Sequence, residues 1–169
     1  MDFKHKIKIM KFLLALSLGL LFTSCTVAKN NYTKIQYEAG ACFGFCPMFK
    51  LTINPDRSTV IEAEHFTFEE GRSKDDFSKE KEGTFTSTIR QEDYNTLIKM
   101  LNKINIKSLN AKYGNRNVTD LPTSYLTVTF KDGTVKKVED YGKHGTDELA
   151  ELWMFLENLR KTQTWTKVK

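Results

Sequence analysis

The chain has little cysteine, histidine and proline, and it lacks the short motifs that mark common enzymes. Three residues of each of these types occur among 169. No G-x-S-x-G, H-E-x-x-H or phosphate-loop pattern is present. No set of nucleophile, base and orienting group can therefore be assigned, and the sequence predicts no catalytic residue, no metal ligand and no cofactor.

A long hydrophobic run is also missing. The one apolar stretch, Phe12–Phe22, is too short to span a bilayer core of about 30 Å. Four lysines precede it, and the small residues Thr23 and Ser24 lead from it to Cys25. A basic start, a short apolar run and small residues at its end are typical of a secretion signal, with an uncleaved anchor as the alternative.

The end of this segment resembles the lipobox of bacterial lipoproteins, in which the cysteine is acylated and the chain is cut just before it. The resemblance implies a lipid on Cys25 that attaches the protein to a membrane. Residues 26–31 lack the aspartate that holds many such lipoproteins at the inner membrane. We therefore expect a lipid-anchored protein of the bacterial cell envelope, at the outer membrane and facing the periplasm.

Charge gives no sign of a nucleic-acid partner. The chain has 26 Lys+Arg and 21 Asp+Glu, and residues 1–24 hold four of the lysines and one aspartate. The remainder carries 22 basic and 20 acidic residues, which is too balanced for a nucleic-acid-binding surface. The predicted organisation is a signal peptide (1–24), a tether (25–33), a single domain (34–160) and a C-terminal tail (161–169).

Two periodicities predict the fold class. Alternation of apolar and polar residues predicts six strands, at 34–40, 48–54, 58–68, 84–89, 124–131 and 134–141. Two further segments, Tyr94–Ile104 and Leu149–Leu159, carry apolar residues at helical spacing. We expect an α+β domain, in which an antiparallel sheet of about six strands has both amphipathic helices on one face.

Local signals predict the helix starts and two of the turns. Thr88 and Gln91 fit a capping box for the first helix, and Thr146 is placed to cap the second. Asn54–Arg57 is a turn sequence, and Asp132-Gly133 predicts a two-residue hairpin.

The segment Gly40–Phe49 (GACFGFCPMF) is the most distinctive part of the domain. With lipid on Cys25, an even pair remains, Cys42 and Cys46, and an oxidising compartment favours a disulfide between them. A redox dithiol usually has two intervening residues rather than three, and a zinc site would need two more ligands, such as His65 and His144. These two readings stay as alternatives.

Together with Thr119-Asp120-Leu121-Pro122, this segment resembles the bacterial envelope family catalogued as domain of unknown function 6438. The resemblance covers about residues 34–160. Its loop pattern, C-F/Y-G-x-C-P-x-Y/F, is matched by Cys42–Phe49, and its T-D-x-P step is matched by Thr119–Pro122. Members often have Asp-Gly in the turn after the loop strand, where this chain has Asp56-Arg57. The family implies an envelope setting but no activity, substrate or cofactor.

Both motifs are irregular, proline-terminated loops that begin strands, so we expect them to lie together and form the functional surface. Phe43, Phe45 and Asp120 are the predicted binding residues. The Asp120 carboxylate is expected either to accept hydrogen bonds from loop N–H groups or to cap its own turn. Residues 141–145 (YGKHG) precede a helix and are either an anion site or a plain glycine-rich connection.

The expected function is a non-catalytic binding or structural module for an unknown envelope protein or ligand. The alternative is an envelope hydrolase or thiol-redox enzyme whose site the sequence does not reveal.

Overall fold

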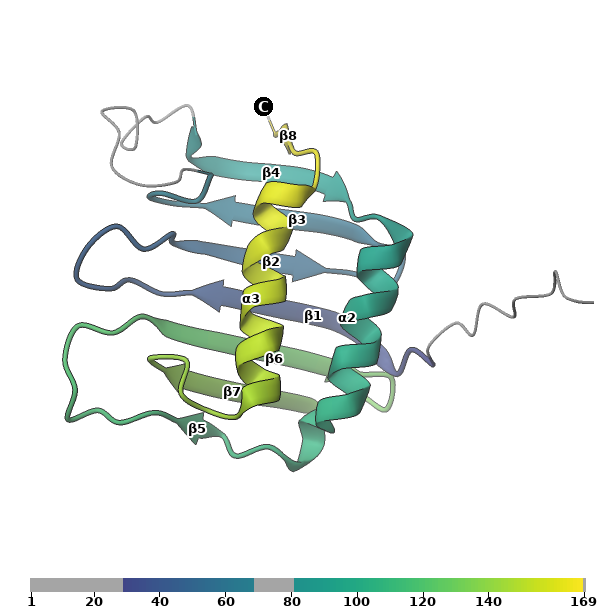
Figure 1. The fold of residues 1–169 in the computed structure, drawn as a ribbon. Coiled ribbons are helices and arrows are strands. Elements are labelled where there is room, and N and C mark those ends of the chain that lie inside the picture. The colour runs from purple at the N-terminus through teal and green to yellow at the C-terminus, as the bar shows by residue number, and fades with distance from the viewer. Residues whose placement is uncertain (1–28, 69–80, 169) are drawn as a thin grey trace, which may run out of the picture.

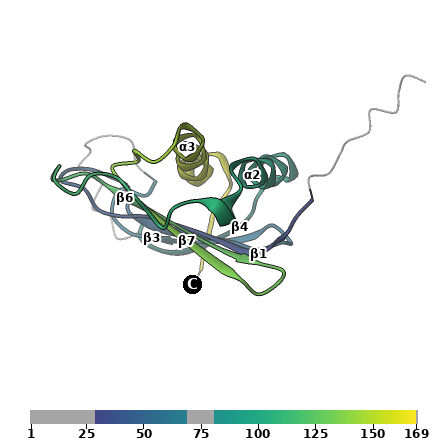
Figure 2. The same cartoon turned by 90° about the horizontal axis from the view of Figure 1, so that it is seen from below.

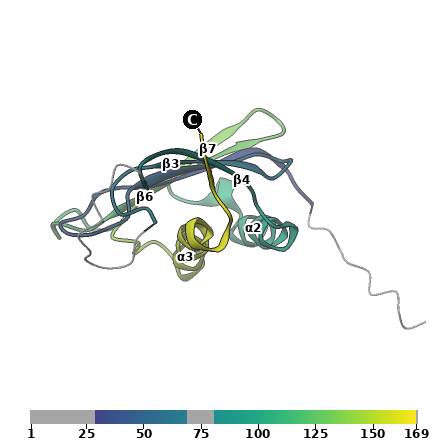
Figure 3. The same cartoon turned by 90° about the horizontal axis from the view of Figure 1, so that it is seen from above.

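The computed structural model describes residues 29–68 and 81–168. They form one α+β domain, an eight-stranded sheet with two helices on one of its faces (Figure 1). Figure 2 and Figure 3 show the two layers edge-on, with the other face of the sheet uncovered by helices. The predicted signal segment and Cys25 lie outside the described residues. Within the described residues, no helix is long and apolar enough to cross a membrane.

The strand order is β5-β7-β6-β1-β2-β3-β4-β8, and only the β5–β7 pair is parallel. The strands are β1 (Tyr32–Ala39), β2 (Phe49–Ile53), β3 (Ser58–Ala63), β4 (Gly83–Thr88), β5 (Lys112–Tyr113), β6 (Thr123–Phe130), β7 (Val135–Tyr141) and β8 (Thr166–Lys167). The helices are α2 (Gln91–Ile104), the short 3₁₀ helix η2 (Ile106–Ser108) and α3 (Asp147–Thr162).

Alternation along the central strands places one set of side chains against the helices. Ile35, Tyr37 and Ala39 of β1 are buried, and β2 pairs with them through Ile53, Leu51 and Phe49. The expected apolar stripes of both helices face this layer, since Leu97 and Leu101 of α2 and Leu152 and Trp153 of α3 are fully buried. The core therefore lies between the sheet and the two helices.

The expected strand number was too low by two. The additional strands, β5 and β8, have two residues each and pair at the two edges of the sheet. Two residues are too few for alternation to be visible, so their pairing depends on the tertiary structure. β8 lies within the segment expected to be a tail, and β1 begins at Tyr32, within the expected tether.

The expected hairpin turn was one residue too short. Residues 131–133 connect Phe130 and Thr134, whose N–H and C=O are 2.9 Å apart, and Gly133 has a φ of 81°. This is a three-residue loop with glycine in the left-handed region. In the turn between β2 and β3, Arg57 has a φ of 71°, so an arginine occupies a backbone conformation that favours glycine.

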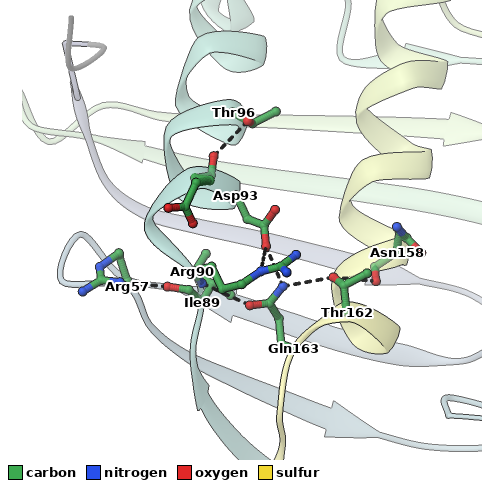
Figure 4. A network of polar contacts seen from close by, with 9 residues as sticks. Arg57, Ile89, Arg90, Asp93, Thr96, Asn158, Thr162 and Gln163 are labelled. Atoms are coloured by element: carbon green, nitrogen blue, oxygen red, sulfur yellow. Dashed lines mark hydrogen bonds and ion pairs between the residues drawn. The ribbon is translucent and has the colours of Figure 1, made fainter. Parts of the chain in front are cut away.

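The predicted capping box at the start of α2 was wrong. Thr88 ends β4, and the N-cap residue is Arg90, which makes no side-chain cap. Instead, Gln163 at the end of α3 accepts a hydrogen bond from Arg90 N (3.1 Å) and donates one to Asp93 Oδ2 (2.7 Å), as Figure 4 shows. At α3 the prediction was right, because Thr146 Oγ1 accepts from Leu149 N at 3.2 Å.

Because Gln163 satisfies the start of a helix from a distant part of the chain, Gln163→Ala should lower the free energy of unfolding by about 1 kcal/mol. Urea denaturation measures the change. Gln91→Ala is the matched control, since among the described residues the Gln91 side chain bonds only to Asn95 on the same helix surface (2.9 Å). Equal stability of the two variants would contradict the role given to Gln163.

Candidate functional site

The loop between β1 and β2 is closed by the disulfide Cys42–Cys46, as the sequence predicted. The two Cα atoms are 5.8 Å apart. Gly44, between the cysteines, has a φ of 141°, which a residue with a Cβ rarely adopts. The disulfide therefore fixes a five-residue ring whose tip is Phe43-Gly44-Phe45.

The two aromatic residues of this ring are in different surroundings. Phe43 is 86% exposed, the largest exposure among the large apolar residues that the structure describes. Phe45 is 42% exposed and packs edge-on against the ring of Phe66, with the centroids 5.2 Å apart. The loop thus exposes the Phe43 side chain to solvent, while the Phe45 side chain packs against the turn that follows β3.

The disulfide loop and the Asp120–Pro122 step lie together at one end of the sheet, which confirms their predicted proximity (Figure 1). Phe43 N donates to the Asp120 carbonyl at 3.3 Å, and Gly40 N donates to the Thr123 carbonyl at 2.8 Å. The contact uses the backbone of Asp120. Within the described residues its carboxylate makes no hydrogen bond, so neither expected role of that side chain is seen.

Tyr141, at the end of β7, holds the loop that contains the Asp120–Pro122 step. Its hydroxyl donates to the Val118 carbonyl at 2.7 Å and accepts from Leu121 N at 3.3 Å. Arg116 stacks over its ring, 4.3 Å from the centroid. These contacts fix residues 116–121 beside the disulfide loop, where Val118 adds another exposed apolar side chain to Phe43 and Phe45.

Behind the two loops lies a polar cluster that the sequence did not reveal. The hydroxyl of Tyr37 donates to Glu157 Oε1 at 2.6 Å and lies 3.1 Å from Ser124 Oγ. Lys143 forms an ion pair with the same carboxylate oxygen. Burial raises the pKa of the Tyr37 hydroxyl well above its usual value of 10.0, and the charge of Glu157 raises it further.

A second buried group, Asp140, supports this cluster. Its carboxylate accepts three hydrogen bonds, from Trp153 Nε1 (2.8 Å), His144 N (3.0 Å) and Gly145 N (3.2 Å). Two N–H groups of the 141–145 segment, the alternative anion site, are thus occupied by the protein's own carboxylate. Trp153 in turn stacks on Tyr37, with the ring centroids 5.6 Å apart.

The space between the loops and the polar cluster is small. A hollow of about 40 Å³ is lined by Gly40, Cys46, Pro47, Pro122, Ser124, Lys143 and Glu157, among others. It has room for a few water molecules at most. Within the cluster, Tyr37 and Ser124 are almost fully buried, whereas the side chains of Lys143 and Glu157 are 30% and 22% exposed.

Backbone strain gathers at this end of the sheet. Asp120 has a φ of 67° and Lys143 a φ of 58°, in a region that residues other than glycine seldom occupy. Such residues are found where the surrounding structure over-determines them, and they often mark ligand-binding segments. For metal binding, no group of three or more His, Cys, Asp or Glu side chains occurs within residues 29–68 and 81–168.

One residue of the polar cluster behind the loops could have been recognised from the sequence pattern. Asp140 follows the inward-facing Val138 by two positions in a strand, so its carboxylate had to be buried. Tyr37 and Ser124 gave no such signal, because both occupy ordinary positions of an inward face. Glu157 lies next to Leu156 of the apolar stripe of α3 and is not distinguished by its spacing.

A comparison with curated proteins finds no match. The model of a protein family described as Domain of unknown function (DUF6438) matches residues 33–160, which include the disulfide loop, the Asp120–Pro122 step and the polar cluster behind them. The chain therefore belongs to this family.

Proposed function

We propose that this protein is a lipid-anchored cell-envelope protein that binds a partner, a protein or another envelope ligand, through the surface formed by the disulfide loop and residues 116–121. We call this the loop surface. The observation that carries the proposal is Phe43, an aromatic side chain 86% exposed on a loop that is closed by a disulfide.

An exposed phenylalanine on a constrained loop favours association for two reasons. Its burial against a partner removes apolar area from water, and aromatic side chains often supply much of the energy of an interface. The disulfide and the Phe43–Asp120 backbone contact have already ordered the loop. The partner therefore gains binding energy without the full cost of ordering that segment.

The polar cluster supports a binding role rather than a catalytic one in this proposal. Glu157 on α3 accepts a hydrogen bond from Tyr37 on β1 and forms an ion pair with Lys143, which lies in the connection between β7 and α3. These contacts join the helix and the connection to the sheet behind the loops. The buried carboxylate of Asp140 fixes the same connection. The loop surface is thus backed by hydrogen bonds from three elements, which keeps its shape before a partner arrives.

The anchor and the compartment are part of the proposal. Lipid on Cys25 would hold the domain at the outer membrane, facing the periplasm, where a disulfide persists. The disulfide Cys42–Cys46 supports this setting, since such bonds are rare in reducing compartments.

Phe43→Ser tests the proposal, by crosslinking in intact cells followed by capture of the protein. We expect the variant to lose most of the crosslinked partner, roughly a tenfold decrease or more, because an interface centre loses about 2 kcal/mol or more on such truncation. Met154→Ser on α3 is the matched control, since Met154 is also a large exposed apolar residue (64%). Undiminished capture of the same partner by Phe43→Ser would overturn the proposal.

A further inference from the structure

A second surface lies at the opposite end of the sheet, where the described chain begins (Figure 1). It is an open groove of about 580 Å³ between β1, the end of α2 and the β6–β7 hairpin. Three lysines (Lys29, Lys107 and Lys131) and Asp132 line it, together with amide, aromatic and aliphatic side chains. We call it the basic groove.

The chain that enters the domain is fixed along this groove. Asn30 Nδ2 donates to Tyr94 Oη at 2.8 Å, and Asn102 Nδ2 donates to the Lys29 carbonyl at 3.0 Å. On the other side, Lys131 N donates to the Asn31 carbonyl at 2.9 Å. Residues expected to be a free tether are therefore part of the domain from Lys29 onward.

This attachment limits how far the groove can lie from Cys25. Lys29 lies four positions after Cys25, and an extended chain spans at most about 3.6 Å per residue. The Cα of Lys29 is thus within roughly 14 Å of the Cα of Cys25. If Cys25 carries lipid at the membrane surface, the basic groove lies at that surface too.

The charge of the groove suits an anionic surface. Lys107 forms an ion pair with Asp132 at 2.6 Å, so these two charges offset each other. Lys29 and Lys131 make no ion pair within the described residues and are both exposed. Two positive charges therefore remain uncompensated at the groove, which suits an anionic surface.

We infer that the basic groove binds the headgroups of anionic phospholipids in the bilayer that holds the Cys25 lipid. The inference rests on the proposed lipid anchor. It gives the domain an orientation, because β1 runs from the groove to the disulfide loop over eight residues, or roughly 25 Å. The loop surface then points away from the membrane, toward a partner in the periplasm.

Lysine labelling of the full mature protein in vesicles tests this inference. The protein is reconstituted in phosphatidylcholine alone, or in equal parts of phosphatidylcholine and phosphatidylglycerol, and is treated with a water-soluble amine reagent. We expect the labelling rates of Lys29, Lys107 and Lys131 to fall by about fivefold or more when phosphatidylglycerol is present. High salt should remove this protection, because it screens the surface charge.

Lys107 then serves as a reporter in two matched double variants. Lys29→Gln with Lys131→Gln should abolish its protection, whereas Lys50→Gln with Lys137→Gln, which removes the same charge from the uncovered face of the sheet, should preserve it. Equal labelling of Lys107 in both vesicle types would overturn the inference.

The mass of the N-terminal peptide separates this inference from the proposed anchor. If Cys25 is acylated but the groove lysines are not protected, the inference is overturned and the proposed anchor stands. An unmodified Cys25 overturns the anchor and the orientation that depends on it. Headgroup binding by the groove is then tested alone, and it is overturned unless the protein floats with phosphatidylglycerol vesicles and not with phosphatidylcholine vesicles.

Discussion

Asp140→Ala should lower the free energy of unfolding by about 4 kcal/mol, the largest effect that we expect from a single substitution in this domain. The carboxylate is fully buried and accepts three N–H groups, two from the backbone of residues 144 and 145 and one from Trp153. Alanine removes the acceptor and leaves those donors without a partner. Such a loss is a large part of the 5–15 kcal/mol that typically separates folded and unfolded states.

Urea denaturation at neutral pH measures this change. Asp147→Ala is the matched control, because Asp147 is an exposed carboxylate in the first turn of α3, seven residues away in sequence. We expect it to cost less than about 1 kcal/mol, through the helix dipole alone. If the two variants are equally stable, Asp140 does not hold the connection as described.

Gly145 belongs to the same arrangement. A Cβ at this position would lie 2.9 Å from Asp140 Oδ2 and 2.8 Å from Leu149 Cδ1. Glycine therefore lets the backbone approach the carboxylate closely enough for its N–H to donate. The YGKHG sequence allowed either an anion site or a plain connection. In the structure His144 N and Gly145 N donate to the buried Asp140 carboxylate, whereas Gly142 N donates to the Pro122 carbonyl at 2.8 Å.

Most of the fold followed from periodicity. Alternation in β1, β2 and β6 and the helical stripes of α2 and α3 extend over enough residues for one buried face to be recognised. The two-residue edge strands offered no period. The cap of α2 could not be predicted, because Gln163 is 73 residues from Arg90 in the chain and only the packing of α3 brings the two together.

The site was only half predictable for a similar reason. Cysteine, glycine and proline marked the two loops, because these residues restrict or free the backbone locally. The backing of the loops comes from pairs such as Tyr37 and Glu157, which are 120 residues apart. Nothing local distinguishes a tyrosine that will hydrogen-bond to a distant glutamate from one that merely fills the core.

Tyr37→Phe should lower the free energy of unfolding by about 2 kcal/mol at neutral pH. The variant keeps the ring that stacks on Trp153 but removes the hydroxyl shared by Glu157 and Ser124. Glu157 keeps its ion pair with Lys143, whereas the fully buried Ser124 loses its neighbour. Tyr113→Phe is a suitable control, since in the part of the chain that the structure describes the Tyr113 hydroxyl bonds only to the exposed Asn110 N, from which it accepts (3.0 Å).

The difference between wild type and Tyr37→Phe should shrink at alkaline pH. Burial and the charge of Glu157 raise the pKa of Tyr37 in the folded protein above the 10.0 of an unfolded chain. Above that pH the unfolded tyrosine releases a proton that the folded one retains, so wild-type stability falls as pH rises. Tyr32 and Tyr94, whose pKa values burial also raises, cause a smaller decline in both proteins.

Urea midpoints at neutral pH and above pH 10 measure this effect, with the Tyr113→Phe variant treated in parallel. We expect Tyr37→Phe to lose less stability between the two conditions than either wild type or the control. Parallel declines in all three proteins would mean that Tyr37 ionises as readily when folded as when unfolded. The hydroxyl would then be open to water, and the disulfide loop would lack the buried polar support that the proposed binding surface requires.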